Sequence, residues 1–541
     1  MKLFESSWRD GFSFYERYYD TQLKKSVKKL VDLPYEWYEP SSNGIYTSIL
    51  DESIRLEKKQ GNAKQGKDQY GFLDPMYRNI RDNYWNKDAY NINPNIWYLD
   101  IETRVGTVST GFPVPEKAAE PISLMQFYDT NTSTMFVLGL RDWKHQNDYN
   151  FDYTVKYVKC KNEIELLENF LTLFQRLDPL IVYAWNGMGF DYPYIFNRLK
   201  NLGIDTDRLS NYGKTKLTQS EFQGRTDFSF SSDGHFFIDL MDVYKKFVFS
   251  PRPSYSLDTI AEIELGDKKV QHTEYAGFDD FYTGKYVIPN EPNEYQLNSK
   301  IYQEAIKNGV NDEVRELAHS EFVYYGIKDT YLIKQIDNKL NFTALMNMIA
   351  EKMGVQIGDS MGTVKPWSQY ILNKSYLKKQ IMPQRKEFGD PHVVGGYVRD
   401  PNKGKHKWVI SADVNSMYPL LGMVGFNMSP ETFIPKYKLP DLLRDLVLTY
   451  FNDQNEANRL DLSEDVWNTV IKELQEHNLA LGINGAVFNK DKLGMVPEMV
   501  QSIYDSRKQA KKTMFKYEQQ KILIKEILKY KKENNWNNWN K

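Results

Sequence analysis

The pattern of apolar and polar residues predicts strands that alternate with helices between residue 96 and about residue 341. The run IWYLDIET is a short apolar segment that ends in carboxylates, and SLMQFYD and TMFVLGLRDW have the composition of neighbouring strands. The helical stretch ELLENFLTLFQRL then precedes another apolar strand, IVYAW. Such alternation predicts an α/β sheet with its functional groups at strand ends.

Two further segments of this region have a clear pattern. KTKLTQSEFQGRTDFSFSSDGHFF alternates polar and apolar residues around Gln223 and Gly224, which predicts an extended β-hairpin. EFVYYGIKDTYLIKQIDNKL has the spacing of an amphipathic helix with Tyr325, Asp329 and Ile333 on one face.

The pattern is less regular towards both ends of the chain. Residues 1 to about 94 mix short aromatic segments with polar linkers, which indicates a β-rich or mixed domain. WVISADVNSMYPLLG predicts a strand that turns at Pro419, and residues 499–532 predict one long helix with a basic exposed face. A chain of 541 residues is expected to form about three or four domains.

Composition narrows the class of protein. Seventy basic residues against 72 acidic ones give a net charge of -2, which argues against a histone-like binder, so contacts with DNA need local basic surfaces. No segment approaches the roughly 20 apolar residues of a membrane span, and we expect a soluble protein without a membrane partner. The single cysteine, Cys160, excludes an intramolecular disulfide and fits the cytoplasm.

Acids at the ends of predicted elements are the main candidates for chemistry. Asp100 and Glu102 lie two apart on a strand and share one side of it, where close negative charges repel unless a cation separates them. Asp191 opens a helix after a strand and loop, and Asp329 follows Tyr325 by one helical turn on an inward face. Structural explanations stay open for each: surface acids at a strand end, a helix N-cap and a core tyrosine.

The motifs DIET, NGMGFD and YGIKD, in this order across about 230 residues, resemble those of the DnaQ-like (DEDDy), ribonuclease H-like exonucleases. The resemblance implies a two-metal 3′→5′ exonuclease site. In it Asp100, Glu102 and Asp329 surround the tighter metal, Asp191 supports the second, and Tyr325 orients the attacking water. Oxygen ligands and phosphate chemistry favour two Mg²⁺ ions, with Mn²⁺ as the alternative.

A second set of residues resembles the family-B DNA polymerases. SADVNSMYP is similar to their motif A, DxxSLYPSI, and departs from it at Met417 and Leu420. The resemblance implies that Asp413 binds a metal for nucleotide transfer, that backbone amides near Ser416 and Met417 face the dNTP, and that Tyr418 excludes a ribose 2′-hydroxyl. In isolation the same residues would be an ordinary strand-to-turn element.

Segments on both sides of this motif match the same family. VVGGYVRDP resembles the linker that touches the template backbone, and MVPEMVQSIYDSRKQAKKTM resembles the first fingers helix. The latter implies that Arg507 and Lys511 face an incoming triphosphate, although a solvated basic helix face is the alternative. LMDVYKKFVFSPRPSYSLDTIAE and GTVKPWSQYIL resemble the polymerases of T-even-type bacteriophages, and the whole resemblance spans residues 90 to 525. The resemblance also implies that the hairpin around Gly224 separates a primer end from its template.

The resemblance implies a multidomain α/β protein with four parts. These are an amino-terminal domain, 1–94, to which 342–384 return, an exonuclease domain, 95–341, a partial palm, 385–493, and the first part of the fingers, 494–541. The KxxxNxxYG-type fingers motif and the YGDTDS-type palm turn, which carries the second metal-binding aspartate, do not occur in the sequence.

Some T-even-type phages divide this polymerase near the fingers tip, so we expect a second chain that supplies the remaining fingers, palm and thumb and binds a sliding clamp. The other expected partners are a single-stranded 3′ end, primer-template DNA and dNTPs, in the cytoplasm of the infected bacterial host. Two alternatives stay open. The chain is an artificial fragment of a one-chain polymerase, or it is a DNA-binding scaffold whose catalytic residues are inactive.

Overall fold

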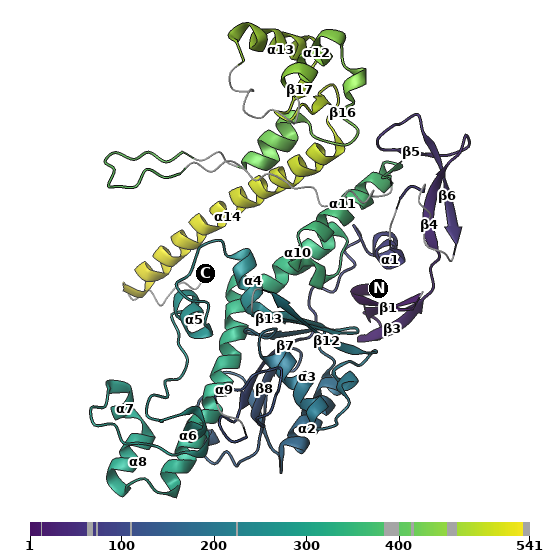
Figure 1. The fold of residues 1–541 in the computed structure, drawn as a ribbon. Helices are drawn as coiled ribbons and strands as arrows, with labels where there is room; N and C mark the ends of the chain where they lie inside the picture. Colours follow the sequence, from purple (N-terminus) through teal and green to yellow (C-terminus); the bar gives the residue numbers. More distant parts are fainter. Residues whose placement is uncertain are drawn as a thin grey trace, which may run out of the picture. The chain divides into compact units, whose positions relative to one another are not determined.

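The computed structural model is drawn as a ribbon in Figure 1. The chain forms two compact units, each assembled from two separate stretches of sequence. The first contains Met1–Pro34 and Leu73–Asn373, and the second contains Tyr35–Phe72 and Lys374–Lys541. The division into four domains stays a prediction. The structure describes residues 1–11, 13–61, 69–71, 74–108, 111–222, 225–383, 400–412, 416–451 and 462–533.

A six-stranded sheet with the order β10-β9-β8-β7-β11-β14 forms the centre of the first unit. β7 pairs antiparallel with β8 and parallel with β11, and β11 pairs parallel with β14. The strands predicted from IWYLDIET, SLMQFYD, TMFVLGLRDW and IVYAW are therefore confirmed as β7 Ile96–Thr103, β8 Ile122–Asp129, β9 Thr134–Gly139 and β11 Ile181–Ala184. The other two strands, β10 Thr154–Lys159 and β14 Phe236–Asp239, were not among those predicted.

Alternation along β7 places two kinds of residue on the two faces of this sheet. Trp97, Leu99 and Ile101 are buried on one face in a cluster that also holds residues of α2 (Glu163–Leu177) and α3 (Asp191–Asn201). Tyr98 lies on the opposite face, in the cluster that contains the buried side of α9 (Asp312–Leu340). Because side chains two apart share a face, Asp100 and Glu102 lie on the α9 side.

A second group of strands in this unit lies outside the central sheet. β1 (Lys2–Asp10), β2 (Ser13–Asp20) and β3 (Lys25–Val31) form an antiparallel three-stranded sheet. β12 (Thr215–Phe222) pairs antiparallel with β13 (Arg225–Ser232), which confirms the predicted hairpin, although Gln223 and Gly224 lie outside the described residues.

The amphipathic helix predicted around Tyr325 is confirmed as part of α9, which begins earlier than its motif indicated because Asn311 caps it. The other helices of the first unit are α1 Pro75–Asn83, α4 Leu240–Phe247, α5 Leu257–Leu265, α6 Phe278–Thr283, α7 Glu294–Asn298, α8 Lys300–Asn308 and α10 Phe342–Met353; α11 Val364–Leu377 contains the boundary between the units.

Among the described residues, the second unit contains two small sheets, the end of α11, the π-helix Tyr418–Gly425 and the helices α12 (Asp441–Tyr450), α13 (Glu464–Glu476) and α14 (Met495–Glu533). The long helix predicted near the end of the chain is thus confirmed as α14. One sheet of the second unit has the order β15-β5-β6-β4 and the other has the order β16-β18-β17. The bounds of these strands are β4 Tyr35–Pro40, β5 Tyr46–Ser48, β6 Arg55–Gly61, β15 Gln380–Ile381, β16 Phe433–Ile434, β17 Leu479–Leu481 and β18 Val487–Asn489.

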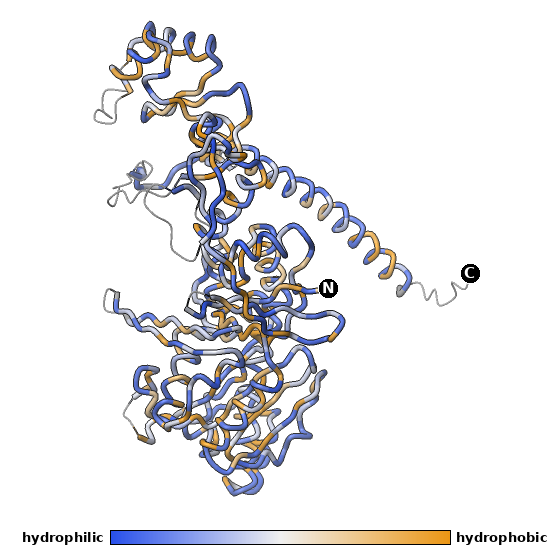
Figure 2. The backbone as a smooth tube through the Cα atoms, turned by 90° about the vertical axis from the view of Figure 1, so that its right-hand side faces the viewer, coloured by the Kyte–Doolittle hydropathy of each residue, from blue (hydrophilic) through white to orange (hydrophobic). Residues whose placement is uncertain are grey.

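Apolar and polar residues alternate along α14 (Figure 2), and many of its apolar side chains are exposed. They are Met514, Phe515, Tyr517, Ile522, Leu523, Ile524, Ile527, Leu528 and Tyr530. Within the described ranges, no helix is both long enough and apolar enough to cross a membrane.

The strand predicted for WVISADV is wrong for the part that the structure describes. Residues 400–412 contain no strand, and Trp408 and Ile410 are 97% and 92% exposed. A strand needs a partner for its backbone hydrogen bonds, and none of the described strands pairs with this segment. Asp413 lies outside the described residues. Further along the chain, Tyr418–Gly425 form a π-helix.

Candidate active site

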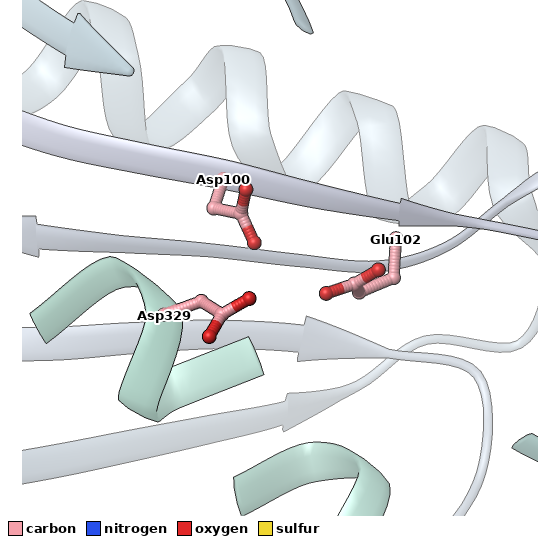
Figure 3. A group of neighbouring side chains, drawn as sticks. All are labelled: Asp100, Glu102 and Asp329. Atoms are coloured by element: carbon pink, nitrogen blue, oxygen red, sulfur yellow. The ribbon is translucent and has the colours of Figure 1, made fainter. Parts of the chain in front are cut away.

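Asp100 and Glu102 project from the same side of β7 towards Asp329 on α9 (Figure 3). One oxygen from each of the three carboxylates lies within 4.8 Å of the others. Glu102 and Asp329 are buried, with 8% and 2% of their surface exposed, and Asp100 is partly buried. The structure therefore brings together three acids that are up to about 230 residues apart in the sequence.

A glycine allows α9 to approach the sheet closely enough for this contact. A Cβ atom on Gly326 would lie only 2.8 Å from Gln126 Nε2 on β8, which is closer than side-chain atoms normally pack. The same Gln126 nitrogen donates a 2.8 Å hydrogen bond to Asp100 Oδ2. Gly326 and Gln126 therefore fix the spacing between Asp329 and Asp100, a role that no sequence motif indicated.

Asp191, the fourth predicted acid, is the first residue of α3 and is 3% exposed. Its carboxylate is not among the three that meet within 4.8 Å. Burial, followed by the negative charge of Asp100, raises the pKa of Asp191 well above its usual range, so Asp191 lies close enough to Asp100 to interact with it electrostatically. The turn before it is held by Asp239, which accepts hydrogen bonds from the backbone N–H groups of Asn186 and Met188, both at 3.1 Å.

Burial raises the pKa of all four acids, and repulsion within the group adds to this rise for Asp100, Glu102 and Asp191. Burial, followed by the charge of Asp329, raises the pKa of Asp100 to about 7. Burial, Asp100 and Asp329 raise the pKa of Glu102 well above its usual range, and burial raises that of Asp329. In the absence of a compensating cation, the cluster therefore favours protonated carboxyls.

Lys269 is a member of this site that sequence reasoning missed. Its Nζ forms an ion pair with Asp329 and donates a 3.1 Å hydrogen bond to the Tyr325 hydroxyl. The charge of Lys269 and its hydrogen bond to Asp329 oppose the rise in the pKa of Asp329, as does a hydrogen bond between Tyr325 and Asp329. Burial acts to lower the pKa of Lys269, but the neighbouring negative charges outweigh it and raise that pKa well above its usual range. Lys269 follows α5 in a segment without a recognisable motif, so only the fold reveals it.

The donor set fits divalent cations. Asp329 Oδ1 is buried and has no hydrogen-bond partner among the described residues, which leaves a carboxylate oxygen available as a ligand. Lys269 supplies one positive charge against four acids, so net negative charge remains when the four carboxyls are ionised. Hard oxygen ligands of this kind suit Mg²⁺ or Mn²⁺.

The raised pKa values predict how stability depends on pH without metal. The pKa of Asp100 is about 7 in the folded protein against an ordinary value of 3.8, so folding favours its proton. This contribution to stability is fully present below about pH 4 and is lost as the pH rises through about 7. We expect the melting temperature in EDTA to fall over this range and excess Mg²⁺ to restore it at pH 8.

Asp100→Asn is the control, because it removes the titrating carboxyl with little change in shape. Its melting temperature should fall less with pH and respond less to Mg²⁺. An equal fall in the variant and the parent would show that Asp100 does not carry this dependence.

The residues predicted for nucleotide binding lie in the second unit. Met417 and Tyr418 are 46% and 74% exposed, and Ser416 has a left-handed backbone with φ +54°. The short helix that Tyr418 begins packs against α14, which carries Arg507 and Lys511 as exposed residues four apart. Because Asp413 lies outside the described residues, the metal site of this group stays a prediction.

Comparison with known proteins gives matches to two family models, each over a different part of the chain. The family described as "DNA polymerase family B, exonuclease domain" matches residues 72–260, and "DNA polymerase family B" matches residues 363–532. The first match contains Asp100, Glu102 and Asp191, and the second contains Asp413.

Individual relatives agree with these matches. The DNA-directed DNA polymerase of Escherichia phage RB69 is 25% identical over 556 residues, and that of Enterobacteria phage T4 is 23% identical over 553 residues. Each alignment covers 96% of this chain and 54% of the relative. A DNA polymerase of Thermococcus litoralis is 24% identical over 284 residues, which is 50% of this chain and 14% of the relative.

The chain spans about half the length of its phage relatives. Both family matches and the phage relatives point the same way, to a family-B DNA polymerase sequence that includes the exonuclease domain.

Proposed function

We propose that the first unit is a two-metal 3′→5′ exonuclease with a ribonuclease H-like, DnaQ-like fold that removes nucleotides from a single-stranded DNA 3′ end. The observation that carries this proposal is the meeting of Asp100, Glu102 and Asp329 within 4.8 Å, with Asp191 as their electrostatic neighbour. The acids come from three elements, β7, α9 and α3, and their mutual repulsion has no structural benefit unless cations bind there.

Each residue has a distinct role in the proposed site. Asp100, Glu102 and Asp329 would hold one divalent cation, and Asp191 would support a second. When bound, two such ions stabilise the attacking and leaving oxygens of phosphoryl transfer. The Tyr325 hydroxyl, held by Lys269, orients the attacking water, and the charge of Lys269 helps to keep Asp329 ionised.

A nuclease assay of the chain alone tests this function. We expect a labelled single-stranded oligonucleotide to be shortened one nucleotide at a time from its 3′ end in Mg²⁺ or Mn²⁺ and to stay intact in EDTA. A chain that binds the oligonucleotide but does not shorten it in either metal would instead favour the catalytically silent DNA-binding scaffold.

We further propose that the second unit is the first part of a DNA polymerase that adds dNTPs to primer-template DNA during phage replication in the host cytoplasm. A second chain would supply the remaining palm, fingers and thumb, with a sliding clamp bound through it. The exposed apolar residues of α14, together with Trp408, Val409 and Ile410 at 97%, 75% and 92% exposure, support burial by such a partner. A one-chain polymerase of which this is a fragment would use the same surface.

A further inference from the structure

Residues of the amino-terminal strands β1 and β2 contact the base of the β12–β13 hairpin. The Ser6 hydroxyl on β1 and Arg17 Nη1 on β2 both donate 3.1 Å hydrogen bonds to the carbonyl oxygen of Gly234, which follows β13. On the other side of the base, the rings of Trp8 and Tyr212 lie 5.4 Å apart, and Tyr212 precedes β12. Strands β1 and β2, about 200 residues away in the sequence, thus contact the residues on both sides of the hairpin base, before β12 and after β13.

Arg17 is the centre of this contact and is only 1% exposed. Its Nε donates a 2.8 Å hydrogen bond to Glu5, and its Nη2 donates one of 2.9 Å to the carbonyl oxygen of Asp178. The guanidinium lies 4.9 Å from the centroid of the Tyr212 ring. A buried guanidinium with this many partners has little freedom, so it defines a rigid base.

Asp178, at the end of α2, joins this base to the central sheet. It accepts hydrogen bonds from the Tyr212 hydroxyl and from Asn211 Nδ2, the latter at 2.6 Å. The Asn211 backbone N–H donates to His235 Nε2 at 3.1 Å, which ties the chain entering β12 to the chain leaving β13. Burial lowers the pKa of His235 to about 3, so its ring is neutral and can accept this bond.

The hairpin strands themselves have fewer constraints. Phe230 of β13 packs against Tyr192 and Phe237 near the base, whereas residues such as Gln219 of β12 are exposed. An element anchored at one end changes direction as a whole when the anchor loosens. The direction of the hairpin is therefore set by the few contacts at its base.

We propose that Arg17 and Tyr212 are positioning residues that hold the β12–β13 hairpin in the direction needed to separate a primer end from its template. This inference rests on the proposed exonuclease function, and it gives the amino-terminal strands a part in choosing between duplex and single-stranded substrates. Neither residue touches the four acids, so digestion of an already single-stranded end does not need them.

Tyr212→Phe tests this proposal because it removes only the hydroxyl group that donates a hydrogen bond to Asp178. We expect digestion of a mismatched duplex 3′ end to slow by about tenfold, as for loss of a hydrogen bond to a charged group, while single-strand digestion stays within about twofold. Tyr90→Phe is the matched control, since its buried hydroxyl donates to Val355 elsewhere in the same unit, and it should leave the ratio of the two rates unchanged.

A second measurement reports hairpin direction without activity. Spin labels at Gln219→Cys and Lys156→Cys place one probe on the hairpin and one on β10, and the native Cys160 is buried. We expect Tyr212→Phe or Arg17→Lys to broaden the distance distribution between the labels. An unchanged distribution, or equal slowing on both substrates, would overturn the positioning role. Absence of single-strand digestion in the parent chain would instead refute the proposed exonuclease.

Discussion

Replacement of Asp329 by asparagine is expected to slow single-strand digestion in Mg²⁺ by more than about a thousandfold, equivalent to about 4 kcal/mol at the transition state. The carboxylate lies on α9 within 4.8 Å of two other acids, and its Oδ1 has no protein partner in the part of the chain that the structure describes. Asparagine keeps the shape but removes the charge that a divalent cation requires. Initial rates on a labelled oligonucleotide measure the effect.

Asp337→Asn is the matched control for this variant. Asp337 lies two turns further along the same helix and is equally buried, but it accepts hydrogen bonds from Tyr98 and Thr343 outside the cluster. The Asp337→Asn variant should retain most of the nuclease activity. The Asp100→Ala variant should lose this activity, as Asp329→Asn does. Oligonucleotide binding should change little in all three. Retained cleavage by Asp100→Ala would remove these acids from the mechanism.

Primer extension is expected only when the missing polymerase segments are added. The sequence lacks the palm turn that would carry the second metal-binding aspartate, so this chain alone should not incorporate dNTPs. Mixing it with a polypeptide that contains the remaining palm, fingers and thumb should produce a complex and restore extension. Gel filtration and a primer-extension assay measure the two results.

Variants in each site separate the two activities in the restored complex. Asp413→Ala should abolish extension and leave single-strand digestion intact, and Asp100→Ala should do the reverse. If the mixture forms no complex and extends no primer, while a single polypeptide joining the same segments does, the two-chain arrangement is wrong and the one-chain alternative holds.

The strands β7, β8, β9 and β11 and the helix α9 could be predicted from the sequence because their signals are local. Alternation of apolar and polar residues in IWYLDIET predicted a strand with Asp100 and Glu102 on the same face. The spacing from Tyr325 to Asp329 predicted that both residues lie on one face of a helix. Local periodicity of this kind survives folding, since it reflects which side of an element is buried.

Features that depend on contacts between distant segments could not be predicted. Lys269 reaches Asp329 only because the chain after α5 folds back to α9, and Gly326 matters only because Gln126 faces it. The strand expected near Trp408 failed for a related reason, since an apolar run forms a strand only when another strand pairs with it.

Diffraction from crystals grown with Mn²⁺ and a single-stranded oligonucleotide would locate the metal ions and the DNA 3′ end. We expect two anomalous peaks within coordinating distance of the carboxylates of Asp100, Glu102, Asp191 and Asp329, beside the 3′ end of the strand. Mn²⁺ bound elsewhere, or a 3′ end placed away from these four acids, would contradict this expectation.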